Sequence, residues 1–159
     1  MLLSNNRKLK SISTHFFKII YAFIYSIDPK IINNVLFNLN NNEYKYIENK
    51  NEKFLVFGKD GGVSRQLYVN GEYNLNTLKK TIDILGRFDL IIDVGANIGS
   101  TSISSIKKKY AKKAIAIEAD EKNYKLLKTN ITLNEIEEKV LTFNNLVTDK
   151  NKNFRAVKI

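Results

Sequence analysis

The sequence predicts an α/β fold with a parallel sheet, and three observations carry that prediction. Short apolar runs at residues 90–92 and 114–117 are typical of strands that are buried on both faces of a sheet. Segments with helical periodicity alternate with these runs as far as residues 140–143. Glycines at 95 and 99 directly follow the first run, where a strand would turn into a helix. Such an order implies parallel strands joined by right-handed crossovers.

Residues 88–159 contain the parallel part of the predicted fold. We expect, in order, a strand at 90–92, a helix from 99 or 100 to about 110, a strand at 114–117, a helix at 121–133 and a strand at 140–143. Only about three strands of the sheet are therefore present, and the fold is predicted to be truncated after them.

Residues 30–87 are predicted to form an N-terminal extension with a β-hairpin and a helix. Residues 54–57 indicate a strand, residues 60–62 read Asp-Gly-Gly and indicate a turn, and residues 63–69 alternate like a second strand. Asn74 or Asn76 is expected to cap a helix that runs to about residue 85. Residues 30–53 are rich in Asn and predict helix fragments and loop.

Residues 1–29 are predicted to form a third unit, a basic amphipathic N-terminal helix. Apolar residues recur at helical spacing between residues 12 and 27, and Pro29 is expected to end the helix. The apolar stretch is too short to span a bilayer, and no small-residue cleavage site follows it. We therefore expect a cytoplasmic protein in which residues 11–27 dock on the domain itself, on a partner or on a membrane surface.

The composition excludes several kinds of site. The chain has no Cys and only one His, His15, so disulfides, thiolate nucleophiles, and Cys- or His-based metal centres are excluded. The net charge of +10 would ordinarily favour an acidic partner. However, Lys, Asn and Ile number 22, 21 and 20, and all three have A/T-rich codons, so we interpret the charge as compositional.

The motif that carries chemistry lies in residues 91–99. Glycines allow backbone amides to approach a ligand, and the helix that follows directs its free N–H groups to the same place. Glu118 ends the next strand, 25 residues after Asp93, where an acid can accept hydrogen bonds from ribose hydroxyls. A nicotinamide site would have Gly at 95, 97 and 100, but the chain has Asn97 and Ser100. Asp93 suits a ligand with a cationic amine, which S-adenosylmethionine has in addition to a ribose.

Residues 92–99, which read Ile-Asp-Val-Gly-Ala-Asn-Ile-Gly, and residues 117–130, which begin Ile-Glu-Ala-Asp-Glu, extend this interpretation. In these segments the sequence resembles the FkbM-type methyltransferases, which use S-adenosylmethionine and have the Rossmann-like class I methyltransferase fold. Ala119 stands where that family usually has Pro. The resemblance covers roughly residues 89–149.

The resemblance implies roles for particular residues. Asp93 would bind the methionine part of the cofactor, the glycine loop would pass beneath it, Glu118 would bind the ribose, and Asn144 would line the adenine pocket. The candidate cofactor-binding residues are Asp93, Gly95, Ala96, Asn97, Gly99, Glu118 and Asn144. No catalytic residue and no metal ligand is assigned.

The resemblance also implies O-methylation of a small-molecule hydroxyl, such as one of a saccharide, with no nucleic-acid partner. Two alternatives stay open: a nucleic-acid methyltransferase that uses the basic surface, notably the lysines at 107–109, 112 and 113, and a non-catalytic remnant that serves only as an interaction chain.

The family's later strands, including one with an acidic end, have no counterpart after Asn145. We therefore expect an N-terminal fragment that binds the cofactor weakly, does not catalyse alone and leaves residues 90–94 at an unpaired sheet edge.

Overall fold

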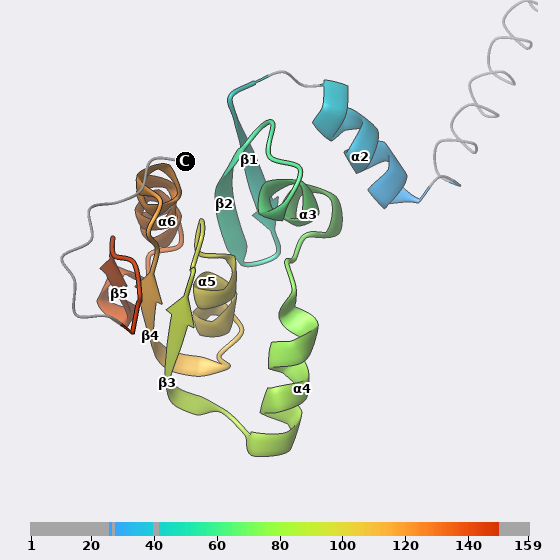
Figure 1. The fold of residues 1–159 in the computed structure, drawn as a ribbon. Coiled ribbons are helices and arrows are strands. Elements are labelled where there is room, and N and C mark those ends of the chain that lie inside the picture. Colours follow the sequence, from blue (N-terminus) through green and yellow to red (C-terminus); the bar gives the residue numbers. More distant parts are fainter. Residues whose placement is uncertain (1–25, 27, 40–41, 150–159) are drawn as a thin grey trace, which may run out of the picture.

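The computed structural model describes residues 26, 28–39 and 42–149 and arranges them in layers (Figure 1). The helices are α2 (Pro29–Leu39), α3 (Val63–Asn70), α4 (Leu75–Leu85), α5 (Ser100–Lys107) and α6 (Glu121–Leu133), and a 3-10 turn η1 spans Glu137–Lys139. The strands are β1 (Tyr44–Asn49), β2 (Glu52–Phe57), β3 (Phe88–Val94), β4 (Ala111–Ile117) and β5 (Val140–Phe143).

The parallel sheet has the order β3-β4-β5. Val94 is level with Ile117, and Ile117 with Phe143, so the three carboxyl ends lie along one edge. The predicted α/β, Rossmann-like fold is confirmed, and the predicted bounds of α6 and β5 are those observed. β3 lies at the side of this three-stranded sheet, as expected.

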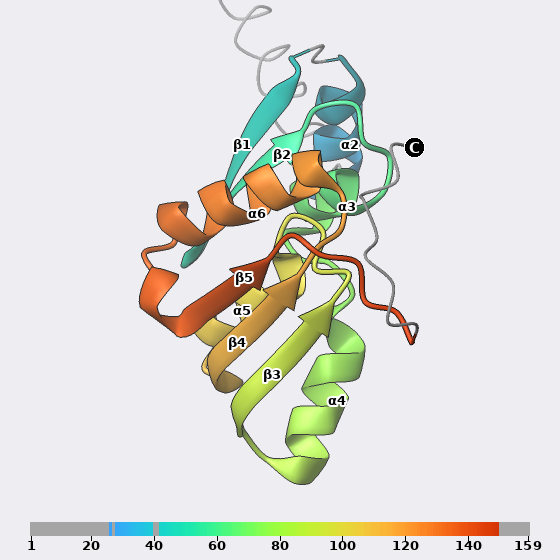
Figure 2. The same cartoon turned by 60° about the vertical axis from the view of Figure 1, so that its left-hand side comes forward.

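The crossover helices α5 and α6 separate this sheet from the hairpin. Right-handed crossovers that both step in the same direction place both helices on the same face. In Figure 2 the three strands face the viewer and α5 lies behind them. Ala114 and Ala116 of β4 are buried on the covered side. Beyond the helices, Phe54 of β2 joins the same core cluster as Ile103 and Leu127, so the hairpin belongs to one continuous core.

The predicted hairpin exists, but its strands are not the predicted pair. β1 and β2 pair antiparallel around a two-residue loop, Lys50 and Asn51. Residues 63–70, predicted in part as the second strand, form helix α3 instead. The reason is local: the Asp60 carboxylate accepts hydrogen bonds from the N–H groups of Gly62 and Ser64, at 2.8 and 2.9 Å. Asp-Gly-Gly therefore starts a helix here, as an Asx-type turn can.

Strand β1 was missed because its inward residue is charged. Lys45 is buried between exposed Tyr44 and Tyr46, so the sequence shows no apolar alternation there. Its ammonium group donates to the carbonyl oxygens of Phe37 and Gly58 and lies 3.7 Å from the centre of the Phe37 ring. These contacts replace the water that the cation loses.

At the N-terminal side, Pro29 begins α2, where a missing N–H costs nothing. The Asp28 carboxylate accepts a hydrogen bond from the Lys30 N–H at 2.9 Å. The helix predicted within residues 11–27 lies outside the described residues apart from Ser26, and so do the contacts predicted for it. Within the described ranges, no helix has the length and apolar character needed to cross a membrane.

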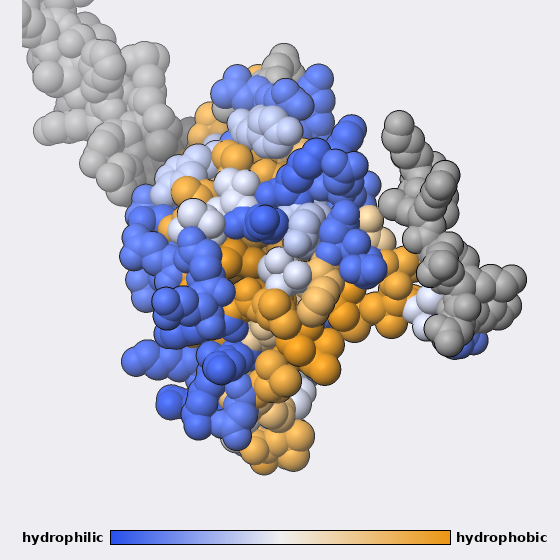
Figure 3. Space-filling view, turned by 90° about the vertical axis from the view of Figure 1, so that its left-hand side faces the viewer, coloured by the Kyte–Doolittle hydropathy of each residue, from blue (hydrophilic) through white to orange (hydrophobic). Residues whose placement is uncertain are grey.

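The face of the sheet opposite α5 and α6 is apolar and exposed. Its exposed apolar side chains are Leu90, Ile92 and Val94 of β3 and Leu141 and Phe143 of β5, and exposed Lys113 of β4 lies beside Leu90. Figure 3, which views the molecule from the side where β5 lies in Figure 1, shows an extended hydrophobic area. An apolar patch of this kind favours association.

We predict that this face drives self-association of the chain. Replacing Ile92, which is 62% exposed, by Lys is expected to raise the dissociation constant for self-association about tenfold, since a buried Ile contributes roughly 1.5 kcal/mol or more to such a contact. Sedimentation velocity over a concentration series measures this. Thr132→Lys adds the same charge at an exposed position on α6 and serves as the control; an equal effect of both variants would contradict the prediction.

Candidate functional site

The turn between β3 and α5 has a backbone that few residue types adopt. Gly95, Asn97 and Gly99 have φ angles of 78°, 53° and 91°, in the left-handed region. The N–H groups of Gly95 and Ala96 both donate to the Ile117 carbonyl, at 2.9 and 3.0 Å, and so attach the turn to the end of β4. We call residues 95–99 the glycine loop.

The two glycines of this loop serve different purposes. A Cβ on Gly99 would lie 2.7 Å from the Leu127 side chain, so Gly99 permits close packing of the loop on α6. A Cβ on Gly95 would meet no atom within 4 Å, so the loop is open to solvent at that point. A flat ligand group can therefore approach the backbone at Gly95, as nucleotide-binding turns of parallel sheets allow.

Glu118 lies between the two turns and is bonded to both. One carboxylate oxygen accepts from the Asn97 N–H at 2.7 Å and the other from the Asp120 N–H at 2.8 Å. The side chain is buried, with 7% of its surface exposed. Each oxygen keeps a second lone pair that can accept a hydroxyl hydrogen. The sequence prediction that Glu118 lies at the site is consistent with this geometry.

Asp93 points from β3 to the first turn of α5. Its carboxylate accepts hydrogen bonds from the Ser102 hydroxyl at 2.6 Å and from the Ser102 N–H at 3.1 Å. Burial raises the pKa of Asp93 above its ordinary value of 3.8, and the nearby Glu118 charge adds to the rise, while the bonds from Ser102 lower it in part. Asp93 is thus a half-buried acid that is held by Ser102.

Asn144 directly follows β5 at the same edge of the sheet. Its side-chain amide donates to the carbonyl oxygens of Glu118 and Ala119, at 2.9 and 3.3 Å. It therefore orders the turn after β4. Asp93, the glycine loop, Glu118 and Asn144 all lie along one edge of the sheet, as expected for parallel strands.

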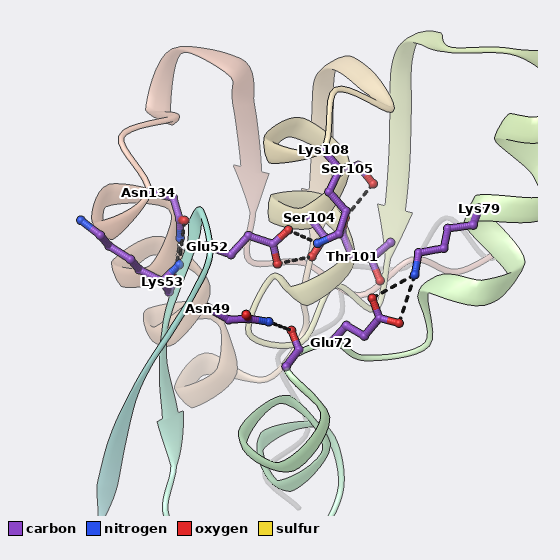
Figure 4. Close-up of polar contacts among 11 residues, drawn as sticks. Asn49, Glu52, Lys53, Glu72, Lys79, Thr101, Ser104, Ser105, Lys108 and Asn134 are labelled. Carbon is purple, nitrogen blue, oxygen red and sulfur yellow. Dashed lines mark hydrogen bonds and ion pairs between the residues drawn. The ribbon is translucent and has the colours of Figure 1, made fainter. Parts of the chain in front are cut away.

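The lysines at 107–109, 112 and 113, named above for the nucleic-acid alternative, have partners within the fold at three positions. Lys108 pairs with the buried Glu52 carboxylate of β2, which also accepts from Ser104 (Figure 4). Lys107 donates to the Asn134 carbonyl, and Lys112 pairs with exposed Asp89. Lys107 and Lys108 thus help attach α5 to its neighbours.

Two residues at the site received no role from the sequence. Ser102, in the first turn of α5, is the partner of Asp93. Asn130, fully buried on α6, donates to the Ile98 carbonyl of the glycine loop at 2.9 Å. Its position one turn after Leu126 and Leu127 on the apolar face was the available signal, because a polar residue there must find partners.

Comparison with known proteins identifies the family. A model of the TRM5/TYW2 methyltransferase domain matches residues 68–159, more than half of the chain. The chain belongs to the TRM5/TYW2 methyltransferase domain family. The match includes β3, α5, β4, α6 and β5, and therefore every candidate cofactor residue. The prediction of a methyltransferase is thereby confirmed.

Solved structures of Trm5 and TYW2 proteins are similar in fold to this chain. Trm5 of Methanocaldococcus jannaschii, solved with adenosine, has a TM-score of 0.50 and 24% identity over 67% of this chain and 31% of that chain. A Trm5 in complex with tRNALeu has the same TM-score and identity over 67% of this chain and 29% of that one. TYW2 of M. jannaschii, solved with AdoMet, has a TM-score of 0.48 and 22% identity over 65% and 43%. The chain thus spans less than half the length of these three proteins. None of the curated proteins matches the sequence.

These findings correct three predictions. The family is TRM5/TYW2 and not FkbM, so sugar O-methylation is wrong as the function. The expectation that nucleic acid is no partner is wrong too, because a relative is solved with tRNALeu. The glycine loop and the acid after β4 define a cofactor site that many methyltransferases share, so they carry no information on the acceptor. Of the solved relatives, one holds adenosine and another AdoMet.

The partial burial of Asp93, which raises its pKa, predicts a pH effect on stability. A carboxyl whose pKa is higher in the folded than in the unfolded state stabilises the fold below the unfolded pKa, and this contribution is lost as the pH rises through the folded pKa. We therefore expect wild-type stability, relative to Asp93→Asn, to fall as the pH rises from about 4. Urea unfolding of both proteins across this pH range measures the difference.

Asp89→Asn is the control for this experiment. Asp89 is exposed, and its hydrogen bond with Lys112 lowers its pKa, so any slope has the opposite sign. A wild-type stability that rises with pH relative to Asp93→Asn would contradict the assignment.

Proposed function

We propose that the chain forms the cofactor-binding part of a methyltransferase that takes S-adenosylmethionine and acts on tRNA. The observation that carries this proposal is the TRM5/TYW2 match to residues 68–159, the segment that contains the glycine loop, Glu118 and Asn144. The chain is shorter than its solved relatives, so the activity, the acceptor and the partner of a whole protein are part of the proposal.

The residues present fit the nucleoside half of this cofactor. Glu118 has carboxylate lone pairs beyond those bound by Asn97 and Asp120, and these would accept the two ribose hydroxyls. The open side of Gly95 would let the cofactor lie against the backbone. Asn144, which orders the turn after β4, would border the adenine.

The methionine half is assigned to Asp93. The side chain is half-buried and its carboxylate accepts hydrogen bonds from Ser102, so an ammonium group would find a negative partner with spare acceptor capacity there. When bound, S-adenosylmethionine supplies an electrophilic methyl group on a sulfonium. The task of the chain is to hold that group in a fixed place, because methyl transfer depends on alignment with the attacking atom.

The acceptor is proposed from the family and from charge. A Trm5 relative is solved with tRNALeu. The net charge of +10, interpreted above as compositional, suits a polyphosphate partner whatever its origin. This proposal takes up the nucleic-acid methyltransferase alternative raised in the sequence analysis.

We predict that Glu118→Ala weakens adenosine and S-adenosylmethionine equally, by about tenfold or more, because the variant loses hydrogen bonds to a charged acceptor. Asp93→Asn is expected to weaken S-adenosylmethionine by a similar factor and to leave adenosine unchanged, since adenosine has no amino acid group. Isothermal titration calorimetry of each variant with each ligand measures these effects.

Glu121→Gln, at an exposed carboxylate on the first turn of α6, is the matched control and should bind like wild type. A wild-type protein that takes up neither ligand would refute the cofactor proposal, and equal losses with Glu121→Gln would refute the role of Glu118.

For the acceptor, we predict that the chain binds tRNA with an affinity that falls steeply as salt rises, because phosphate contacts release counterions. Filter binding between about 50 and 200 mM salt measures the slope. Heparin at equal charge concentration is the control polyanion. We expect the chain to retain tRNA in the presence of heparin. If heparin displaced all of the tRNA, the binding would be general charge attraction, and this would count against tRNA as the acceptor.

A further inference from the structure

Helix α6 completes the free edge of the hairpin with two asparagine side chains. β1 occupies one edge of β2, and on the other edge Asn130 and Asn134 bond to the backbone as a neighbouring strand would. Asn130 accepts from the Leu55 N–H at 2.7 Å and donates to the Leu55 carbonyl at 3.1 Å. Asn134 does the same with Lys53, at 3.0 and 2.6 Å (Figure 4).

Only one of these two asparagines reaches the glycine loop. The Asn130 amide also donates to the Ile98 carbonyl at 2.9 Å, whereas the Asn134 amide donates back to the Asn130 carbonyl within α6. Asn130 is fully buried, and its amide group has a partner for its oxygen and for each of its two hydrogens. It therefore joins the hairpin, α6 and the glycine loop at one point.

The Ile98 carbonyl lies within the glycine loop, between residues that contact Glu118 and α6. Ile98 follows Asn97, whose N–H binds Glu118, and precedes Gly99, which packs on Leu127. A shift of the Ile98 peptide would move the Asn97 N–H and with it one of the two bonds that orient the Glu118 carboxylate. The geometry of the ribose acceptor thus depends on a bond made by α6.

We propose that Asn130 is a positioning residue that holds the glycine loop in its cofactor-binding geometry, and that the hairpin supports the cofactor site through it. This inference rests on the proposed function. Residues 52–57 of the hairpin precede the segment matched by the family, so the inference assigns them a role in the site that the match does not supply.

Asn134 provides a matched control. Asn130 lies in the last turn of α6 and Asn134 is the C-cap residue of that helix, and each side chain makes two bonds to β2. Replacing either by Ala removes two bonds to the hairpin, but only Asn130→Ala also removes the bond to the glycine loop. Both variants therefore loosen the hairpin, whereas only Asn130→Ala removes a bond that positions the glycine loop.

The test compares adenosine affinity by calorimetry and backbone hydrogen exchange in Asn130→Ala, Asn134→Ala and wild type. We expect Asn130→Ala to weaken adenosine about threefold to tenfold, the ratio that one hydrogen bond gives, and Asn134→Ala to change it less than twofold. Amide exchange in residues 53–57 should accelerate in both variants, and exchange in residues 95–99 only in the Asn130 variant.

Asn130→Ser, which removes less volume and keeps a polar group, is measured in the same way if Asn130→Ala does not fold. Equal changes in affinity and in loop exchange for the two positions would overturn the positioning role. If wild type binds no adenosine, the proposed function fails, and the exchange of residues 95–99 still decides whether Asn130 holds the loop.

Discussion

The arrangement of the site depends on one buried carboxylate that is shared by two turns. Glu118 receives a main-chain N–H from the turn after β3 and another from the turn after β4. Each of these turns leads into a helix, so the negative charge lies near the positive ends of α5 and α6. Asn144 attaches the end of β5 to the same place. Three strand ends are thereby held in register by side-chain bonds in addition to the sheet itself.

The same use of polar side chains continues behind the helices. Glu52, buried in β2, is neutralised by Lys108 and bonded by Ser104, both on α5. Asn130 and Asn134 attach α6 to the same strand. The hairpin therefore contacts both crossover helices through specific polar bonds as well as through Phe54 and its apolar neighbours. Polar contacts of this kind fix one docking geometry, whereas apolar packing alone tolerates several.

The parallel half of the fold was predictable from sequence because its signals are local. The apolar runs of β3, β4 and β5 and the glycine loop are visible in the sequence itself, and the predicted bounds of α6 were those observed. The hairpin was misassigned at two places where individual side chains determine the structure. Lys45 is buried in β1, so this strand lacks an alternation of apolar and polar residues. The Asp60 carboxylate accepts a hydrogen bond from the Ser64 N–H, so the predicted hairpin turn starts a helix instead.

The site was predictable in part, and the acceptor was not. Asp93, Glu118 and Asn144 lie at one sheet edge, as strand order requires. The role of Asn130 depends on contacts with residues 75 and 32 positions away, which a local pattern does not reveal. The family was misread because the residues that bind a common cofactor are shared among methyltransferases with different acceptors.

The bonds between β2 and α6 also have a consequence for the order of folding. They join residues 75 and 81 positions apart, so closing them carries a large loss of chain entropy. During synthesis the hairpin leaves the ribosome before α6 has been made. The edge of β2 that later bonds to Asn130 and Asn134 therefore stays unpaired until α6 docks. The glycine loop, bonded to α6 through Asn130, then reaches its final shape only after that late docking step. The hairpin is thus completed by a helix that is made later along the chain.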